Sequence, residues 1–185
     1  WEPAALPTAR RLREGEAFIL DVAPLVTGHP ADYAYSGPHG LLQGALADIK
    51  ARIVAWAREA TDGGELFRTV GADVDRRGLD AVHPLYPAGV LGHTLDSISF
   101  GSVPRIGDGF QIPLLGTYAV AILGHRFLGT PYPFIDAASR EKPAGLYAVE
   151  PHVATGGVGA KFESILLIDG DETRWLDPEL YGDVA

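Results

Sequence analysis

The stretch LYAVEPHVATGGVGAKFESILLIDG, residues 146–170, contains two strand-like runs joined by a Gly-Gly pair. Gly-Gly favours a two-residue hairpin turn, because both residues of that turn take positive φ. Pairing the runs symmetrically about Gly156 and Gly157 predicts that Glu150 lies opposite Glu163. Like charges that face each other across a ladder are destabilising, so this hairpin needs a positive partner.

A second pair of acids occurs near the start of the chain. Residues 16–23 (EAFILDVA) are typical of a strand, and residues 32–36 of its partner across a loop rich in glycine and proline. This pairing predicts that Asp21 lies opposite Asp32. Apolar residues precede Asp21, so we expect its surroundings to be partly buried.

A divalent cation, or a pair of cations that share carboxylates, is the most economical partner for these four acids. The alternatives are solvated strand ends and ion pairs with arginine or lysine. Two opposed pairs in two hairpins favour the metal. The chain has no cysteine, so any metal must bind to oxygen and imidazole.

The remaining pattern predicts an α+β fold, with helices packed on an antiparallel sheet. Apolar residues recur three and four apart between Leu41 and Ala60, which indicates a helix with one buried face. Gly63 and Gly64 are expected to end it, and Glu65–Leu79 forms a weaker second helix. The further strand-like runs are Ile98–Phe100, Tyr118–Leu123, Leu146–Val153, Ala160–Ile168 and Thr173–Leu176.

Composition predicts one domain that covers residues 1–185, because 46% hydrophobic residues suffice for one core. The 24 acidic and 15 basic residues give a net charge of -9, which argues against nucleic acid and anionic lipid as partners. No apolar run approaches the roughly 20 residues that cross a bilayer. The first 13 residues lack the apolar middle of a secretion signal, so we expect a cytoplasmic protein.

Five residues in their motifs resemble those of the pita-bread-fold metallopeptidases, the family of methionine aminopeptidase, aminopeptidase P and prolidase. FILDVAPLVTGHPAD contains Asp21 and Asp32, GVLGH contains His93, AVEPH contains Glu150, and GVGAKFESILLIDGDE contains Glu163. Their order and context match the family over nearly the whole chain. The resemblance implies a pita-bread fold, an antiparallel curved sheet with helices packed on one side.

The resemblance also implies a metal site for one or two divalent ions. Asp21 would hold one ion, Asp32 and Glu163 would bridge two, and His93 with Glu150 would complete the second. Such an oxygen-rich set favours Mn, Fe or Co, with Mg and Zn as alternatives. Glu150 resembles the proton shuttle of the family, which takes a proton from the attacking water and gives it to the leaving amine.

The sequence departs from the family pattern at several positions. Ala23 replaces the usual glycine of the first aspartate motif, and Ala31 replaces a polar residue. Phe100 stands where the peptidases have a second histidine near the substrate carbonyl. Loss of one such donor typically costs about two to three powers of ten in rate.

The candidates to replace that histidine are His152, His125 and His83. Alternation along a strand puts His152 on the same face as Glu150, so we expect these two to be the catalytic residues. The family domain normally begins with helices and a strand before the first aspartate. Either that part is missing from this sequence or the chain is a reduced version that needs a partner chain.

The sequence therefore predicts a metal-dependent hydrolase that cuts the C–N bond of a small molecule or short peptide, including Xaa-Pro bonds. The alternative is a non-peptidase enzyme of the same fold, a lyase, an amide hydrolase or an iron-dependent oxygenase. It is suggested by Phe100 and by an apolar insertion at residues 113–134, which reads equally as a substrate pocket or as added sheet and core. A non-catalytic binding module is the third hypothesis. The family also suggests a homodimer.

Overall fold

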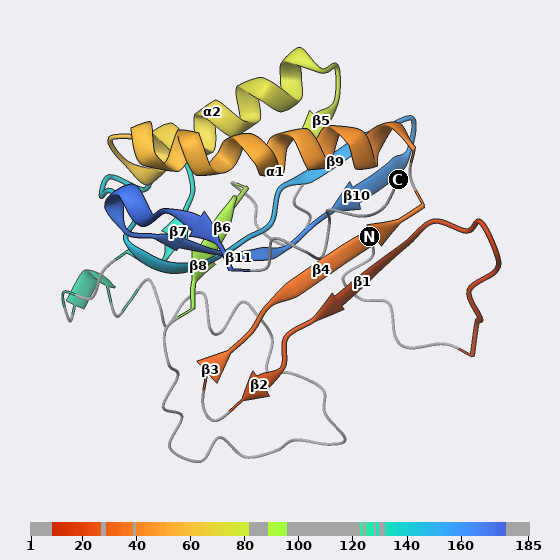
Figure 1. Cartoon of the computed structure of the whole chain (residues 1–185), viewed down its shortest axis with the longest axis horizontal. Coiled ribbons are helices and arrows are strands. Elements are labelled where there is room, and N and C mark those ends of the chain that lie inside the picture. Colours follow the sequence, from red (N-terminus) through yellow and green to blue (C-terminus); the bar gives the residue numbers. More distant parts are fainter. Residues whose placement is uncertain are drawn as a thin grey trace.

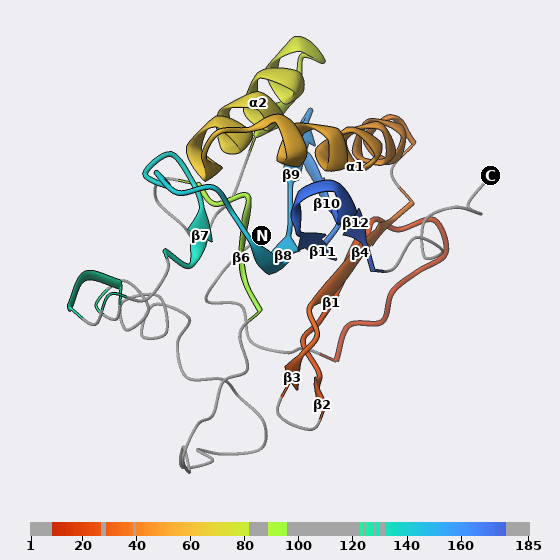
Figure 2. The same ribbon diagram turned by 60° about the vertical axis from the view of Figure 1, so that its left-hand side comes forward.

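The computed structural model describes residues 9–26, 29–38, 40–81, 89–95, 123, 125–127, 129 and 132–176. The helices Leu41–Glu59 and Gly63–Arg76 lie on one side of the central strands, and the first hairpin extends away from them (Figures 1 and 2). This arrangement confirms the predicted α+β class. The elements are α1 (Leu41–Glu59), α2 (Gly63–Arg76), β1 (Phe18–Val22), β2 (Leu25–Val26), β3 (His29–Pro30), β4 (Tyr33–Gly37), β5 (Asp80–Ala81), β6 (Gly92–Thr94), β7 (Phe134–Ile135), β8 (Gly145–Val149), β9 (His152–Thr155), β10 (Val158–Lys161), β11 (Ser164–Ile168), a 3₁₀ turn (Gly170–Glu172) and β12 (Arg174–Trp175).

The hairpin about Gly156 and Gly157 has the predicted register. Strand β10 pairs antiparallel with β9 from the turn to the pair of Lys161 with His152. Both glycines have positive φ, 57° and 79°, as the tight turn requires. Strands β11 and β8 continue the same register, and Ser164 pairs with Val149. The two glutamates therefore lie between two paired stretches, at matching positions of the hairpin.

Strand pairing in the hairpin is interrupted at Glu150 and Glu163, and at this break two segments that are distant in the sequence bind to the hairpin. The backbone of Glu163 exchanges hydrogen bonds of 2.9 and 3.1 Å with Ala34 of β4. The amide of Glu150 donates to the carbonyl of Leu91, directly before β6, at 2.8 Å. Ala34 is also the partner of Asp21 in the first hairpin. Each glutamate thus anchors a segment that carries another acid or a histidine.

The first hairpin forms between β1 and β4, but its predicted register is wrong. Asp21 pairs with Ala34, and in the adjoining short strands Val26 pairs with His29. Asp32 is therefore displaced by two residues from the position opposite Asp21. Because side chains alternate with a period of two, a shift of two keeps both aspartates on one face. Asp21 and Asp32 therefore share a face of the hairpin, but they do not lie directly opposite each other.

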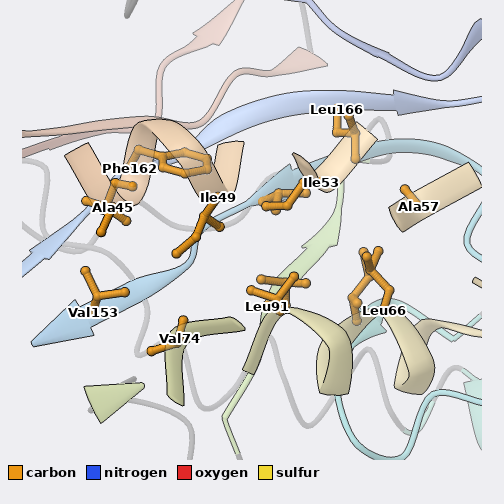
Figure 3. Close-up of a cluster of buried hydrophobic side chains, with 14 of the residues drawn as sticks. Ala45, Ile49, Ile53, Ala57, Leu66, Val74, Leu91, Val153, Phe162 and Leu166 are labelled. Atoms are coloured by element: carbon orange, nitrogen blue, oxygen red, sulfur yellow. The ribbon is translucent and has the colours of Figure 1, made fainter. Parts of the chain in front are cut away.

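The main core lies between α1, α2 and the hairpin strands. The predicted stripe of α1 is buried, and Ile49 and Ile53 are fully inaccessible to solvent. Figure 3 shows both against Phe162 and Leu166 of the C-terminal hairpin. The predicted helix at 41–60 is confirmed. Since Phe162 points into this core, its strand neighbours Lys161 and Glu163 point to the opposite face.

Gly63 and Gly64 begin α2, whereas they were predicted to end the first helix. Asp62 caps this helix, and its Oδ1 accepts a hydrogen bond of 2.7 Å from the amide of Glu65. A Cβ at Gly63 would lie 2.3 Å from Oγ of Ser139. The glycines are needed for this close approach, which the local sequence does not reveal.

Several expectations fall outside the described residues. They are the run Ile98–Phe100, most of Tyr118–Leu123, most of the insertion at 113–134, and His83. Within the described part of the chain, no helix is long and apolar enough to cross a membrane.

Candidate metal centre

The structure brings all five predicted ligands to the break in the C-terminal hairpin. Asp21 lies on β1, Asp32 directly before β4, His93 on β6, and the two glutamates between their paired strands. The side chains of Glu163 and Glu150 are only 3% and 7% exposed. Backbone pairing with Ala34 and Leu91, described above, explains this convergence of segments that are distant in the sequence.

Three of the five side chains present donor atoms to one point. Nε2 of His93 lies 3.6 Å from Oδ2 of Asp32 and 3.9 Å from Oε1 of Glu163. One ligand atom from each of the three lies within 4.8 Å of the other two. A transition metal binds such atoms at about 2.0–2.2 Å, so donors to one ion lie up to roughly 4.4 Å apart. This group therefore fits a divalent ion with little movement.

The orientation of His93 suits this role. Its Nδ1 lies 3.2 Å from the carbonyl oxygen of Thr94, whereas its Nε2 faces the acids. A hydrogen bond at the far nitrogen is the usual way in which proteins hold a metal-binding imidazole. The tautomer with a proton on Nδ1 satisfies the carbonyl and leaves the Nε2 lone pair toward the cluster.

A basic residue that the sequence patterns did not predict, Lys161, lies at the centre of the acids. Nζ of Lys161 lies 2.7 Å from Oδ2 of Asp21, 3.1 Å from Oε2 of Glu150 and 2.9 Å from Oε2 of Glu163. Its side chain is 4% exposed. Part of the positive charge that the carboxylates need is therefore a lysine, as in the ion-pair alternative considered above.

A signal for this lysine is present in the sequence. It precedes Glu163 by two residues in a largely apolar strand, so the two share a face. Lysine is almost never fully buried without a partner. Ser36 fixes its backbone, because the Ser36 hydroxyl accepts from the Lys161 amide at 2.8 Å and donates to its carbonyl at 2.7 Å.

His152 lies beside the cluster. It is the direct partner of Lys161 in the β9–β10 ladder, and directly opposed residues share a face of the sheet. Its Nδ1 is 2.9 Å from the carbonyl oxygen of Glu150. His125 packs instead against the ring of Tyr132, with 5.2 Å between ring centroids. The catalytic role of His152 stays a prediction.

The crowded charges change the acid–base properties of the site. Burial opposes the charged form of His93, but the contact with Asp32 and the charges of the neighbouring acids outweigh it and raise the His93 pKa to about 9. Burial, with the charge of Glu150, raises the pKa of Glu163 to about 8, against the opposing effect of Lys161. For Lys161 the acids outweigh burial, and its pKa is raised further above its ordinary value.

These pKa values predict that metal binding releases protons. A metal takes a neutral imidazole and an ionised carboxylate. Both pKa values lie above 7, so binding of an ion at pH 7 should release protons, and the number released should fall as the pH rises. Affinity should therefore rise with pH over this range. Calorimetric titration with MnCl₂ in buffers of different ionisation enthalpy measures this count, and release of no protons at pH 7 would contradict it.

No protein-family model and no curated protein sequence matches the chain. Among solved structures, it is similar to the X-Pro aminopeptidase of Thermotoga maritima, with a TM-score of 0.61 and 12% identity over 94% of this chain and 42% of that one. The prolidase of Thermococcus sibiricus has a TM-score of 0.58 and 14% identity over 94% and 41%. The methionine aminopeptidase of Rickettsia prowazekii has a TM-score of 0.52 and 13% identity over 92% and 67%.

These similarities establish the fold. The chain spans about two fifths of the length of the prolidase and X-Pro aminopeptidase chains that it matches. The match covers nearly all of this chain, and the helices and antiparallel strands correspond in class. The chain therefore has the pita-bread fold of prolidases, X-Pro aminopeptidases and methionine aminopeptidase, as the resemblance in its motifs implied.

Proposed function

We propose that this chain is a metal-dependent hydrolase that cleaves the C–N bond of a small peptide-like substrate, including Xaa-Pro bonds. The observation that carries the proposal is the convergence of Asp32, His93 and Glu163 on one point, with Glu150 beside it. The solved structures that share this fold are named as prolidases, X-Pro aminopeptidases and a methionine aminopeptidase.

Asp32, His93 and Glu163 would hold the ion. A divalent ion would lower the pKa of the water that acts as nucleophile, and it would polarise the carbonyl group of the substrate. Oxygen and imidazole donors without a thiolate suit Mn, Fe or Co, with Mg and Zn as alternatives.

Glu150 is the proposed general base and acid. Its carboxylate would take the proton of the attacking water and pass it to the leaving nitrogen. Its side chain is buried, which strengthens electrostatic interactions there. His152 is the proposed donor to the oxyanion in place of the missing second histidine; because its Nδ1–H faces the carbonyl oxygen of Glu150, it would donate from Nε2 as an imidazolium.

The test is turnover by the full chain loaded with Mn²⁺. We expect hydrolysis of at least one Xaa-Pro dipeptide in a panel with matched Xaa-Ala dipeptides as controls. Dialysis against EDTA should abolish the activity, and Mn²⁺ should restore it. Turnover that survives the removal of metal would contradict the mechanism.

A second candidate function is a non-peptidase reaction on a small metabolite at the same metal centre. Phe100 favours it, because this side chain cannot donate a hydrogen bond to an oxyanion. Fold alone does not determine the reaction. Metal-loaded protein that cleaves no dipeptide would support this candidate, whereas efficient turnover of Xaa-Pro dipeptides would eliminate it.

A further inference from the structure

We propose that the ammonium group of Lys161 takes the place of a second divalent cation, so that the chain binds one metal ion, at Asp32, His93 and Glu163. This inference rests on the metal centre of the proposed function and determines its stoichiometry. It differs from the two-ion arrangement that the motif resemblance allows.

The ammonium group of Lys161 contacts three carboxylates, as a cation bound at this site would. An ammonium has three N–H donors, and Nζ of Lys161 has one carboxylate oxygen of Asp21, Glu150 and Glu163 at 2.7, 3.1 and 2.9 Å. All three contacts are charge-assisted hydrogen bonds, which are stronger than neutral ones. Oδ2 of Asp21, one of the two oxygens that could bind a first ion, is thus bonded to the lysine.

Glu163 divides its two oxygens between the lysine and the metal centre. Its Oε2 lies 2.9 Å from Nζ of Lys161, whereas its Oε1 lies 3.9 Å from Nε2 of His93. A carboxylate that bridges two cations has this arrangement. Here the bridge joins one ammonium to the point where one divalent ion fits.

The fold resists displacement of the ammonium. Ser36 holds both backbone polar groups of Lys161, and the side chain is 4% exposed. Ions of a two-metal site lie about 3.5–4 Å apart and share carboxylates. A second divalent ion on Asp21 and Glu163 would have to share those carboxylates with the ammonium at close range, where like charges repel strongly.

The experiment counts Mn²⁺ ions in the full chain and in variants. Protein saturated with Mn²⁺ and freed of excess is analysed by elemental mass spectrometry and by electron paramagnetic resonance. We expect one ion and the six-line signal of isolated Mn²⁺ for the wild type. We expect two ions with spin coupling for Lys161→Met, since Asp21, Glu150 and Oε2 of Glu163 then lose the ammonium group. Lys50→Met is the matched control, because Lys50 is also buried, bonds to Ser164 at 2.8 Å, and should leave the count at one.

Two ions in the wild type would overturn the inference while leaving the proposed function intact. A count of one in folded Lys161→Met would overturn it as well, since the lysine would then not be what excludes the second ion. If that variant does not fold, the count and signal of the wild type decide alone. Retention of no ion by the wild type and both variants would contradict the proposed function itself.

Discussion

Glu150→Gln is expected to lower kcat for a cleaved dipeptide by about 10²–10⁴-fold, the usual contribution of a positioned general acid and base. Glutamine keeps the shape of the side chain and can still accept the hydrogen bond of Lys161, but it cannot take a proton from water. The loss should therefore appear in kcat more than in KM. Steady-state kinetics on the most active Xaa-Pro dipeptide measure it.

Two controls make the Glu150 result specific. Glu141→Gln changes an exposed acid and should leave kcat unchanged. The Mn²⁺ content of Glu150→Gln should match that of the wild type, which separates lost proton transfer from lost metal. Full activity of Glu150→Gln with bound metal would exclude this residue as the proton shuttle.

His93→Ala is expected to weaken Mn²⁺ binding by more than about 100-fold, because loss of groups that merely support a ligand already costs 10–100-fold. The ion would lose one of its three protein ligands, and only the carboxylates of Asp32 and Glu163 would remain. The wild type should gain thermal stability on addition of Mn²⁺, by about 2.7 kcal/mol at 100 times Kd. His93→Ala should show almost none of this gain.

Calorimetric titration and thermal melts with and without Mn²⁺ measure both effects. His125→Ala is the matched control, because it removes an imidazole that packs against Tyr132 outside the cluster. It should bind Mn²⁺ as the wild type does. Equal affinity of His93→Ala and the wild type would show that the ion binds elsewhere.

Turn residues and the apolar period of the sequence were sufficient to predict those elements whose partners are near in the chain. The Gly156–Gly157 turn determined the register from β9–β10 through β8–β11, because a tight turn leaves few alternatives for the residues on either side. The buried stripe of α1 followed from its apolar period in the same way.

The same sequence patterns gave wrong predictions for the register of the first hairpin and for the start of α2. Opposition of Asp21 and Asp32 was predicted from the pairing of two strand-like runs across the loop, whereas the pairing of Val26 with His29 sets a register two residues away. The glycines at the start of α2 allow the close approach of Ser139, a residue far along the chain. Neither constraint can be recognised from the neighbouring residues.

The sequence by itself therefore determined the α+β class, the C-terminal hairpin and the five candidate ligands. Only the tertiary structure decided that Asp32, His93 and Glu163 face one point, whereas Asp21, Glu150 and Glu163 surround Lys161. That division depends on β4 and the segment before β6 bonding to the break between Glu150 and Glu163. Such contacts join residues distant in the chain, and their energy depends on the burial and charge that the complete fold creates.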